Sequence, residues 1–461
     1  MTTAEEVRGT ETIEREFLGH PIGLTYLFTT EMWERFSYYG MRALLVLYLT
    51  KYLLLPGHVE NVVGYATIKG FFESFTGPLG VQPFSSMIYG TYTGLVYFTP
   101  LIGGWLADRV WGQRKTVILG AALMAAGHFM MAVESMLFPA LLLLILGNGA
   151  FKPNISTQVG NLYKPGDHRI DRAYSMFYVG INVGAFFSPL VCGTLGEDVG
   201  WHYGFGAAGV GMVIGLCTYL YALRTLPQDA LSIREEKHEA PKPFDRQDWT
   251  AVIALLVLAL PTIFFWATYE QQGNTIALWA DSYTDRTVNL LFFTTEIPVT
   301  WFQAFNPFMI FAFTPFIIGL WSRQAKKGTE PSTVTKMAYG CLLCGASYLI
   351  MAAAAYSLGD GGKVSWLWLF AFFVVITTGE LYLSPIGLSL YNKVAPVRVA
   401  SLMMAVWLAT SFLGNFLAGY LGSFWSSMDK VSFFLMIAAI VSSAGIVIWL
   451  FNKPLKPILK E

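Results

Sequence analysis

Apolar stretches long enough to cross a membrane recur along almost the whole chain, and this repetition constrains the fold more than any other feature. A membrane-spanning helix needs ~20 mostly apolar residues. Of the 461 residues, 54% are hydrophobic and 13% are charged, whereas a soluble domain carries about 25% charged residues. The sequence therefore predicts an all-α polytopic membrane protein with the lipid bilayer as its surroundings. Twelve spanning helices are expected, within residues 22–53, 85–107, 115–134, 136–160, 173–195, 203–224, 250–280, 300–322, 333–358, 364–392, 398–424 and 430–452.

The most polar internal stretch divides the expected helices into two groups of six. It covers residues 225–249 and contains the run REEKHEAPKPFDRQD. We interpret it as a cytoplasmic linker between an N-terminal half at 22–224 and a C-terminal half at 250–452. Cytoplasmic tails at 1–21 and 453–461 complete the predicted organisation.

The distribution of basic residues predicts the orientation. Alternate loops and the two tails hold 22 of the 30 Lys and Arg residues, and the opposite loops hold five. Because basic loops remain in the cytoplasm, both termini are expected on the cytoplasmic side of a cytoplasmic (inner) membrane. The acidic N-terminal stretch lacks the pattern of a signal peptide. The formal net charge is zero, which argues against nucleic acid as a partner.

Ionisable side chains inside the expected spans are the strongest indication of function. Each charge at that depth costs on the order of 3 kcal/mol even on a lenient insertion scale. These side chains must therefore face a protein interior or a wet cavity, and they must find partners. The seven residues concerned are Glu31, Glu34, Arg35, Arg42 and Lys152 in the first half, and Glu270 and Glu380 in the second.

The charges of the first expected helix lie on one face. From Glu31 to Arg42, charged residues and two tyrosines follow the spacing i, i+3, i+4, i+7, i+8 and i+11. A Glu–Arg ladder that only stabilises packing is the alternative. Leucine would pack in a membrane without the desolvation cost, so we favour a functional role.

Two of the other charges lie near prolines. Lys152 precedes Pro153, and Glu380 lies shortly before Pro385, so the fourth and tenth helices should be bent beside their charges. The charged helices lie at corresponding places in the two halves. Such an arrangement is expected when a substrate site lies at the midplane between related halves.

The sequence predicts no metal, cofactor or catalytic site. Cys341 and Cys344 have CxxC spacing, but a second pair and neighbouring His ligands are missing, so we interpret them as packing residues. HExxH is absent, which argues against an intramembrane zinc enzyme, and so is a Gly-rich phosphate loop. The energy for any transport would therefore come from an ion gradient.

Two segments, EMWERFSYYGMR at 31–42 and GGWLADRVWGQRK at 103–115, carry recognisable motifs. The first resembles the signature ExxERFxYYG of the proton-dependent oligopeptide transporter family, a branch of the major facilitator superfamily. The second resembles that superfamily's loop between helices 2 and 3. The resemblance covers both halves and implies the major facilitator fold. Further segments similar to the family's helices 5, 7, 8 and 10 are MFYVGINVGAFFSP, FWATYEQQG, FQAFNP and GELYLSPIG.

The resemblance also implies roles for the residues that match family motifs. Proton coupling would involve Glu31, Glu34, Arg35 and Glu270. Peptide binding would involve Arg35, Tyr38, Tyr39, Tyr97, Lys152, Asn182, Trp266, Asn306, Glu380, Ser384, Trp407 and Ser411. Gating would involve the pairs Arg42–Glu270 and Lys152–Glu380, together with Asp108 and Arg109. For Asp108 and Arg109, a solvated loop without a role is an equal alternative.

Two departures from the family pattern bear on these expectations. Animal members carry a histidine seven residues before the position of Tyr97, and this chain has Gly90 there, so a histidine-dependent proton step is excluded. Many bacterial members insert a helical hairpin between the halves. The linker expected at 225–249 is too short for one, so twelve helices are predicted and not fourteen.

These features together predict a proton-coupled symporter that imports di- and tripeptides by alternating access. The side chains of short peptides vary, whereas their charged termini and backbone do not, and buried charges of both signs suit those constant groups. The protein is expected to act as a monomer, to be no enzyme, and to need only protons as the coupling ion. A same-family carrier of nitrate or a small metabolite is the nearest alternative, and a non-transporting receptor or channel is another.

Overall fold

The computed structural model describes residues 16–164, 166–227, 245–290, 293–359, 362–396 and 399–459. Within these ranges, twelve helices have nineteen residues or more, in agreement with the predicted number. They are α1 (Ile22–Tyr48), α3 (Val81–Leu106), α4 (Gln113–Met131), α5 (Leu137–Asn161), α6 (Ile170–Thr194), α7 (Trp201–Ala222), α8 (Arg246–Tyr269), α10 (Phe305–Lys326), α11 (Thr333–Tyr356), α12 (Leu367–Val394), α13 (Ala400–Gly422) and α14 (Lys430–Leu459).

Judged by length and composition, nine of the twelve helices within the described ranges are long and apolar enough to cross a membrane. The other three are α1, α3 and α4. Helix α1 fails because it carries Glu31, Glu34, Arg35 and Arg42. Helices α3 and α4 contain many small and polar residues, which lower their mean hydropathy.

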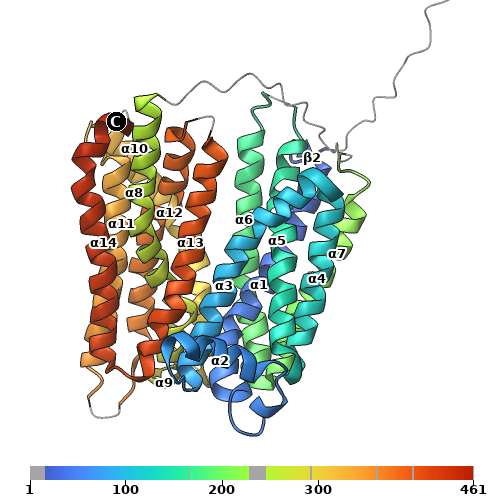
Figure 1. Cartoon of the computed structure of the whole chain (residues 1–461), viewed down its shortest axis with the longest axis vertical. Coiled ribbons are helices and arrows are strands. Elements are labelled where there is room, and N and C mark those ends of the chain that lie inside the picture. Colours follow the sequence, from blue (N-terminus) through green and yellow to red (C-terminus); the bar gives the residue numbers. More distant parts are fainter. Residues whose placement is uncertain are drawn as a thin grey trace, which may run out of the picture.

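The long helices form two groups that stand side by side in Figure 1. Helices α1 and α3 to α7 pack on one another in the first group, and α8 and α10 to α14 do so in the second. The predicted linker falls mostly on residues 228–244, which lie outside the described residues, so its bounds stay a prediction. Helix α14 continues to Leu459, so the predicted cytoplasmic tail at 453–461 begins within this helix, and its bounds stay a prediction.

Short elements cap both ends of the bundle. Strand β1 (Glu16–Phe17) pairs with β2 (His20–Pro21) at the end where the chain terminates. At the opposite end lie α2 (Tyr65–Thr76) and α9 (Thr275–Ser282), neither of which the sequence predicted as a separate helix. Antiparallel strands β4 (Thr287–Leu290) and β5 (Phe293–Glu296) follow α9, and β3 (Thr284–Asp285) pairs with β6 (Val364–Ser365) in parallel.

The expected helix at 250–280 is interrupted. Helix α8 ends at Tyr269, and a 3-10 turn, η6 (Glu270–Gly273), leads through Asn274 into α9. The interruption lies where the other half comes close, because a Cβ on Gly273 would lie 2.1 Å from the Tyr89 hydroxyl. The break therefore reflects a contact between the halves that the apolar pattern of the sequence does not reveal.

Helices α3 and α13 form a close crossing between the halves. A Cβ added to Gly90 would lie 2.5 Å from the Cα and N of Gly419, which are backbone atoms. Backbone atoms cannot move aside as a flexible side chain can. A histidine at position 90 would therefore prevent this contact, which gives the predicted departure from the animal pattern a steric reason.

Candidate functional site

A cavity of about 450 Å³ lies between the two halves. Helices α1, α3, α5 and α6 contribute its wall on one side, and α8, η6, the 3-10 turn η7 (Val299–Ala304), α10, α12 and α13 contribute the other. The structure therefore brings together residues from ten elements of the two halves. The predicted site residues on the wall are Tyr39, Arg42, Tyr97, Lys152, Asn182, Trp266, Glu270, Asn306, Glu380, Ser384, Trp407 and Ser411.

Glu31, Glu34 and Arg35 form a buried cluster that is not part of this wall. The Arg35 guanidinium donates from Nε to Glu34 Oε2 and, over 2.7 Å, from Nη2 to Glu34 Oε1. Its Nε lies 3.3 Å from Glu31 Oε1. Each of the three residues is at most 3% exposed. The Glu31–Arg35 contact follows from α1 itself, because residues four apart share a helix face, whereas Glu34 is the sequence neighbour of Arg35.

The predicted substrate contacts of Arg35 and Tyr38 stay a prediction, and in this structure neither side chain reaches the cavity. The Arg35 guanidinium is occupied by two carboxylates of its own helix, and its Cζ lies 5.1 Å from the centre of the Tyr38 ring. Tyr38 is 4% exposed, and among the described residues its hydroxyl has no hydrogen-bond partner. Both side chains lie behind the cavity wall and not on it.

Asn148 is a functional candidate that the sequence reasoning missed. Its Nδ2 donates to Glu34 Oε1 over 3.1 Å. This hydrogen bond adds to those that Arg35 donates to both oxygens of Glu34. By contrast, Glu31 Oε2 is buried and has no partner in the part of the chain that the structure describes. The available signal was spacing, because Asn148 lies one helical turn before Lys152 on α5.

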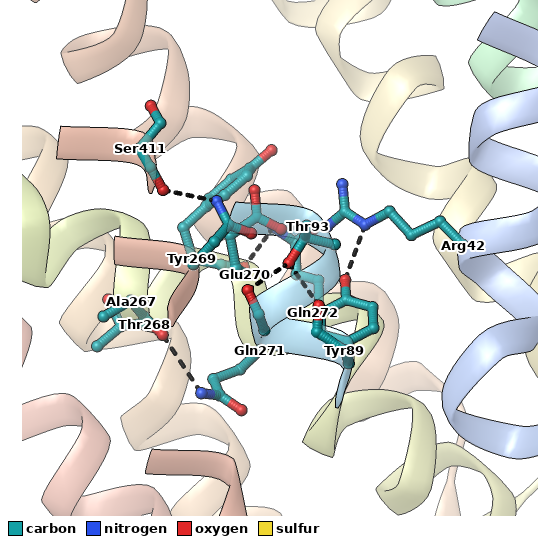
Figure 2. Close-up of polar contacts among 12 residues, drawn as sticks. Arg42, Tyr89, Thr93, Ala267, Thr268, Tyr269, Glu270, Gln271, Gln272 and Ser411 are labelled. Carbon is teal, nitrogen blue, oxygen red and sulfur yellow. Dashed lines mark hydrogen bonds and ion pairs between the residues drawn. The ribbon is translucent and has the colours of Figure 1, made fainter. Parts of the chain in front are cut away.

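Arg42 connects the two halves on the side of the cavity near α2 and α9. Its Nη2 forms an ion pair with Glu270 Oε2, which confirms the predicted pair. Its Nε donates to the Tyr89 hydroxyl over 2.7 Å, and Figure 2 shows Arg42 extending from α1 toward both partners. Tyr89 was not predicted. Tyr89 lies eight residues, or about two turns, before Tyr97 on α3 and so shares its face.

Lys152 and Glu380 both line the cavity but are not paired in this conformation, so the expected bridge stays a prediction. The Lys152 ammonium lies 4.8 Å from the centre of the Tyr97 ring, a cation–π contact within its own half. Glu380 Oε2 accepts from Asn306 Nδ2 over 2.8 Å, also within its own half. Each charge therefore has a local partner in this conformation, and no ion pair joins the two residues.

Comparison with known proteins identifies the family. The sequence model of the POT family matches residues 114–231 and 233–441, which is more than half of the chain. The chain belongs to the POT family. This confirms the resemblance and the all-α polytopic architecture predicted from the sequence.

Individual relatives of this POT family member are similar over nearly their whole length. The "Di-/tripeptide transporter" of Lactococcus lactis subsp. cremoris is 33% identical, over 97% of this chain and 98% of the relative. A peptide transporter of Yersinia enterocolitica is 34% identical over 88% of each chain. A crystal structure of a POT peptide transporter in complex with sulfate has a TM-score of 0.83 at 30% identity, covering 97% of this chain and 98% of that one.

A further solved POT family transporter was crystallised in complex with 5-aminolevulinic acid. It has a TM-score of 0.81 at 28% identity and covers 97% of this chain and 99% of that chain. The agreement in fold with these structures extends over both halves of this POT family member.

The remaining predicted residues of this POT family member lie away from the cavity. Asp108 and Arg109 are exposed in the π-helical turn η3 (Ala107–Trp111) after α3, and neither forms an ion pair with another described residue. Cys341 and Cys344 are buried in α11. Within the described ranges, no group of three or more His, Cys, Asp or Glu residues could hold a metal ion.

Proposed function

We propose that this POT family member carries di- and tripeptides into the cell together with protons, by alternating access. The observation that carries the proposal is the charged cavity between the halves. Lys152 and Arg42 lie on the wall from one half, and Glu270 and Glu380 lie on the wall from the other. Charges of opposite sign on facing walls suit a ligand whose two ends carry opposite charges.

The cavity offers separate groups for each part of a peptide. We propose that Lys152, beside Tyr97, binds the peptide carboxylate, and that Glu380 and Asn306 bind the amino group. Trp266 Nε1 is a buried donor without a partner among the described residues, so it is free to donate to a peptide carbonyl. Asn182, Ser384, Trp407, Ser411 and Tyr39 surround the remaining space.

We propose that this conformation is closed toward the outside. The contacts between the halves concentrate at the end near α2 and α9, where Arg42 pairs with Glu270 and Lys51 Nζ lies 2.6 Å from Asp281 Oδ1. The excess of basic residues in the opposite loops supports placing that opposite end, with both termini, in the cytoplasm.

Movement between two states would exchange these contacts. In the alternate state Arg42 and Glu270 separate, and Lys152 and Glu380 meet as the cytoplasmic side closes, with Asp108 and Arg109 as a latch in their loop. This corresponds to rocking of related halves about a central site.

Proton coupling is proposed for the Glu31, Glu34 and Arg35 cluster, with Glu270 as a further carrier of the proton. Two carboxylates compete for one guanidinium at a buried position, so one of them can exchange its share of that charge for a proton. Binding of peptide carboxylate nearby and uptake of a proton would then favour each other. The chain is proposed to work as a monomer in the cytoplasmic membrane, and protons are its only proposed coupling ion.

The test is uptake of a labelled dipeptide into proteoliposomes, with and without an imposed pH gradient. We expect concentrative uptake only with the gradient, and we expect Lys152→Ala and Glu380→Ala each to abolish it. Lys164→Ala, which removes a basic residue of the loop after α5, is the matched control and should transport normally. Normal uptake by either cavity variant would refute the proposed site.

A second substrate class is supported by the solved relative in complex with 5-aminolevulinic acid, which also has an amino group and a carboxylate. Competition for uptake distinguishes the two substrate classes. Inhibition of dipeptide uptake by di- and tripeptides, with weak inhibition by 5-aminolevulinic acid and none by nitrate, would favour peptides. The opposite order would favour a carrier of small metabolites.

A further inference from the structure

Helix α2 is too short to cross a membrane, and the proposed transport cycle does not explain it. It has twelve residues, YATIKGFFESFT, and lies at the end of the bundle opposite the C-terminus (Figure 1). Four of the twelve residues are aromatic. The positions of these residues around the helix indicate that its sides face different environments.

One face of α2 is fixed to the first turns of two long helices. Phe72 is 6% exposed, and its ring centre lies 6.1 Å from that of Phe84 in the first turn of α3. The Tyr65 ring also contacts Phe84, at 5.8 Å. Just before α2, Val63 N donates to Ser135 O over 3.0 Å, immediately ahead of α5. The depth of α2 is therefore set by the level at which α3 and α5 begin.

A second flank of α2 is aromatic and exposed. Phe71 is 61% exposed and Phe75 is 76% exposed, although both are large apolar side chains. They are four residues apart, and their rings form an edge-to-face pair with centres 5.2 Å apart. The two rings thus form one continuous apolar ridge beside the packed face.

The flank on the other side of the packed face is charged. Lys69 Nζ lies 3.6 Å from Glu73 Oε1, and the same ammonium lies 5.6 Å from the centre of the Tyr65 ring. At 100° per residue, the Phe71–Phe75 ridge and the Lys69–Glu73 pair lie roughly 160° apart around the helix. With one face on the protein, α2 therefore presents an apolar flank and a charged flank in opposite directions.

We propose that α2 lies in the bilayer interface, with Phe71 and Phe75 inserted at the boundary between headgroups and acyl chains, and with Lys69 and Glu73 toward water. The first turns of spanning helices lie at this level, and amphipathic helices with aromatic residues bind there. In the first part of α5, which begins at this level, Leu142 and Leu146 are 55% and 47% exposed, as is expected of side chains that face lipid. The occupant is phospholipid, and not a soluble protein that would cover the ridge from the aqueous side.

The proposal can be tested by spin-label accessibility in the full-length protein in phospholipid vesicles. Cys217, the exposed native cysteine, is first replaced by serine, and the other three cysteines are buried. Single labels are then placed by Phe71→Cys, Phe75→Cys and Lys69→Cys. Collision with oxygen, which concentrates in the bilayer, is compared with collision with a water-soluble nickel complex.

Two reference variants calibrate the measurement. Val210→Cys reports the lipid-facing surface of α7, where Val210 is 52% exposed, and Asn289→Cys reports the exposed hairpin of β4 and β5. We expect the oxygen-to-nickel collision ratio at positions 71 and 75 to be several-fold higher than at 69 and 289, and lower than at 210.

A ratio at 71 and 75 equal to that at 289 would overturn the proposal and would leave the ridge free for a soluble partner. A ratio at 69 equal to that at 71 would also overturn it, because the helix would then lack the two opposed environments. The measurement needs insertion into the membrane but no transport, so its outcome is independent of the proposed substrate and of proton coupling.

Discussion

The two glutamates that share Arg35 differ in their hydrogen bonding, and Asn148 contributes to the difference. Glu34 accepts from Arg35 through both oxygens and from Asn148 as well. Glu31 has one oxygen at 3.3 Å from Arg35 and one without a partner in the described ranges. Protonation of Glu34 would disturb the hydrogen bonds from Arg35 and Asn148, whereas Glu31 Oε2 has no hydrogen bond within the described ranges to lose. We therefore propose Glu31 as the proton carrier and Glu34 as a fixed counter-ion.

This difference leads to opposite expectations for two conservative substitutions. Glu31→Gln should lose uptake driven by a pH gradient and keep exchange of labelled for unlabelled peptide. Glu34→Gln should lose both, because breaking a buried pair from one side costs ~3–5 kcal/mol and leaves Arg35 poorly compensated. Both activities are measured in the same vesicles. Equal behaviour of the two variants would contradict the assignment.

Removal of the Asn148 amide should destabilise the Glu34 carboxylate, because Glu34 then loses one of its hydrogen-bond donors. A hydrogen bond to a charged group contributes about 1.5–3 kcal/mol, so Asn148→Leu should lower peptide exchange about tenfold or more. Asn154→Leu is the control on the same helix, since its amide donates to the backbone oxygens of Ala150 and Gly103 over 2.7 and 3.3 Å. This control should alter thermal stability more than exchange.

At the scale of elements, the ends of α6 and α10 are joined across the halves by a carboxylate. Glu197, in the π-helical turn η5 (Leu195–Val199) after α6, accepts from Val299 N and Thr300 N, both over 2.8 Å, and from Thr300 Oγ1 over 2.7 Å. These groups begin the 3-10 turn η7 (Val299–Ala304) that leads into α10, and a carboxylate is stabilised at such a terminus. Glu197 thus forms a second contact between the halves, on the same side of the cavity as the Arg42–Glu270 ion pair.

Loss of this carboxylate should favour opening on that side. We expect Glu197→Ala to raise the reactivity of Gln303→Cys toward an impermeant thiol reagent, applied at the α2 end, by about tenfold or more, because three hydrogen bonds to a charged group are removed. Cys217 is replaced by serine throughout. Glu296→Ala is the matched control, since Glu296 pairs at 2.6 Å with Arg286 of its own half. An unchanged rate of Gln303→Cys modification in Glu197→Ala would show that Glu197 does not hold this side closed.

The contact between the halves can also be weakened sterically, by a larger residue at the crossing of α3 and α13. Gly90→Ala should hold the halves apart, because its Cβ would meet the Gly419 backbone at 2.5 Å. Uptake should fall and Gln303→Cys should become more reactive. Gly206→Ala on α7 has no atom within 4 Å of the new Cβ and should leave transport unchanged. Normal uptake by Gly90→Ala would show that this crossing opens little during transport.

At the scale of the whole molecule, Arg42 and Glu270 are paired while Lys152 and Glu380 are not. We propose that this structure represents one of two positions of the halves. An exchange of these contacts would change the accessible side of the cavity without breaking the packing inside either half, so the two positions would have similar free energies.

Spin labels at the C-terminal ends of α5 and α12, on the side proposed to be cytoplasmic, can report this movement; they are introduced by Asn161→Cys and Asn392→Cys. Arg42→Ala should shorten the distance between them, because Glu270 is left as an unpaired buried charge and the closed outer side is destabilised. Arg42→Ala with Glu270→Gln removes the uncompensated charge and should partly restore the longer distance. A distance that does not respond to Arg42→Ala would contradict a rocking motion controlled by this pair.

The sequence by itself determined the features that depend on local chemistry. Twelve helices were predicted from mostly apolar stretches of about 20 residues, although α1, α3 and α4 are less apolar than the other nine. The need of the buried charges for partners followed from the cost of a charge in a membrane. The Glu31–Arg35 contact was predictable because residues four apart share one helix face. The Arg42–Glu270 pair required the family resemblance in addition.

The tertiary structure decided everything that depends on how separate helices meet. Asn148 beside Glu34, Tyr89 beside Arg42 and the break after Tyr269 arise from contacts between segments distant in sequence, for which the apolar pattern carries no signal. The absence of a Lys152–Glu380 pair is likewise a property of this arrangement of the halves. Lys152 and Glu380 have local partners in this arrangement, and in the proposed alternate state they would pair across the cavity. Their partners therefore depend on the relative position of the two halves and not on the residues alone.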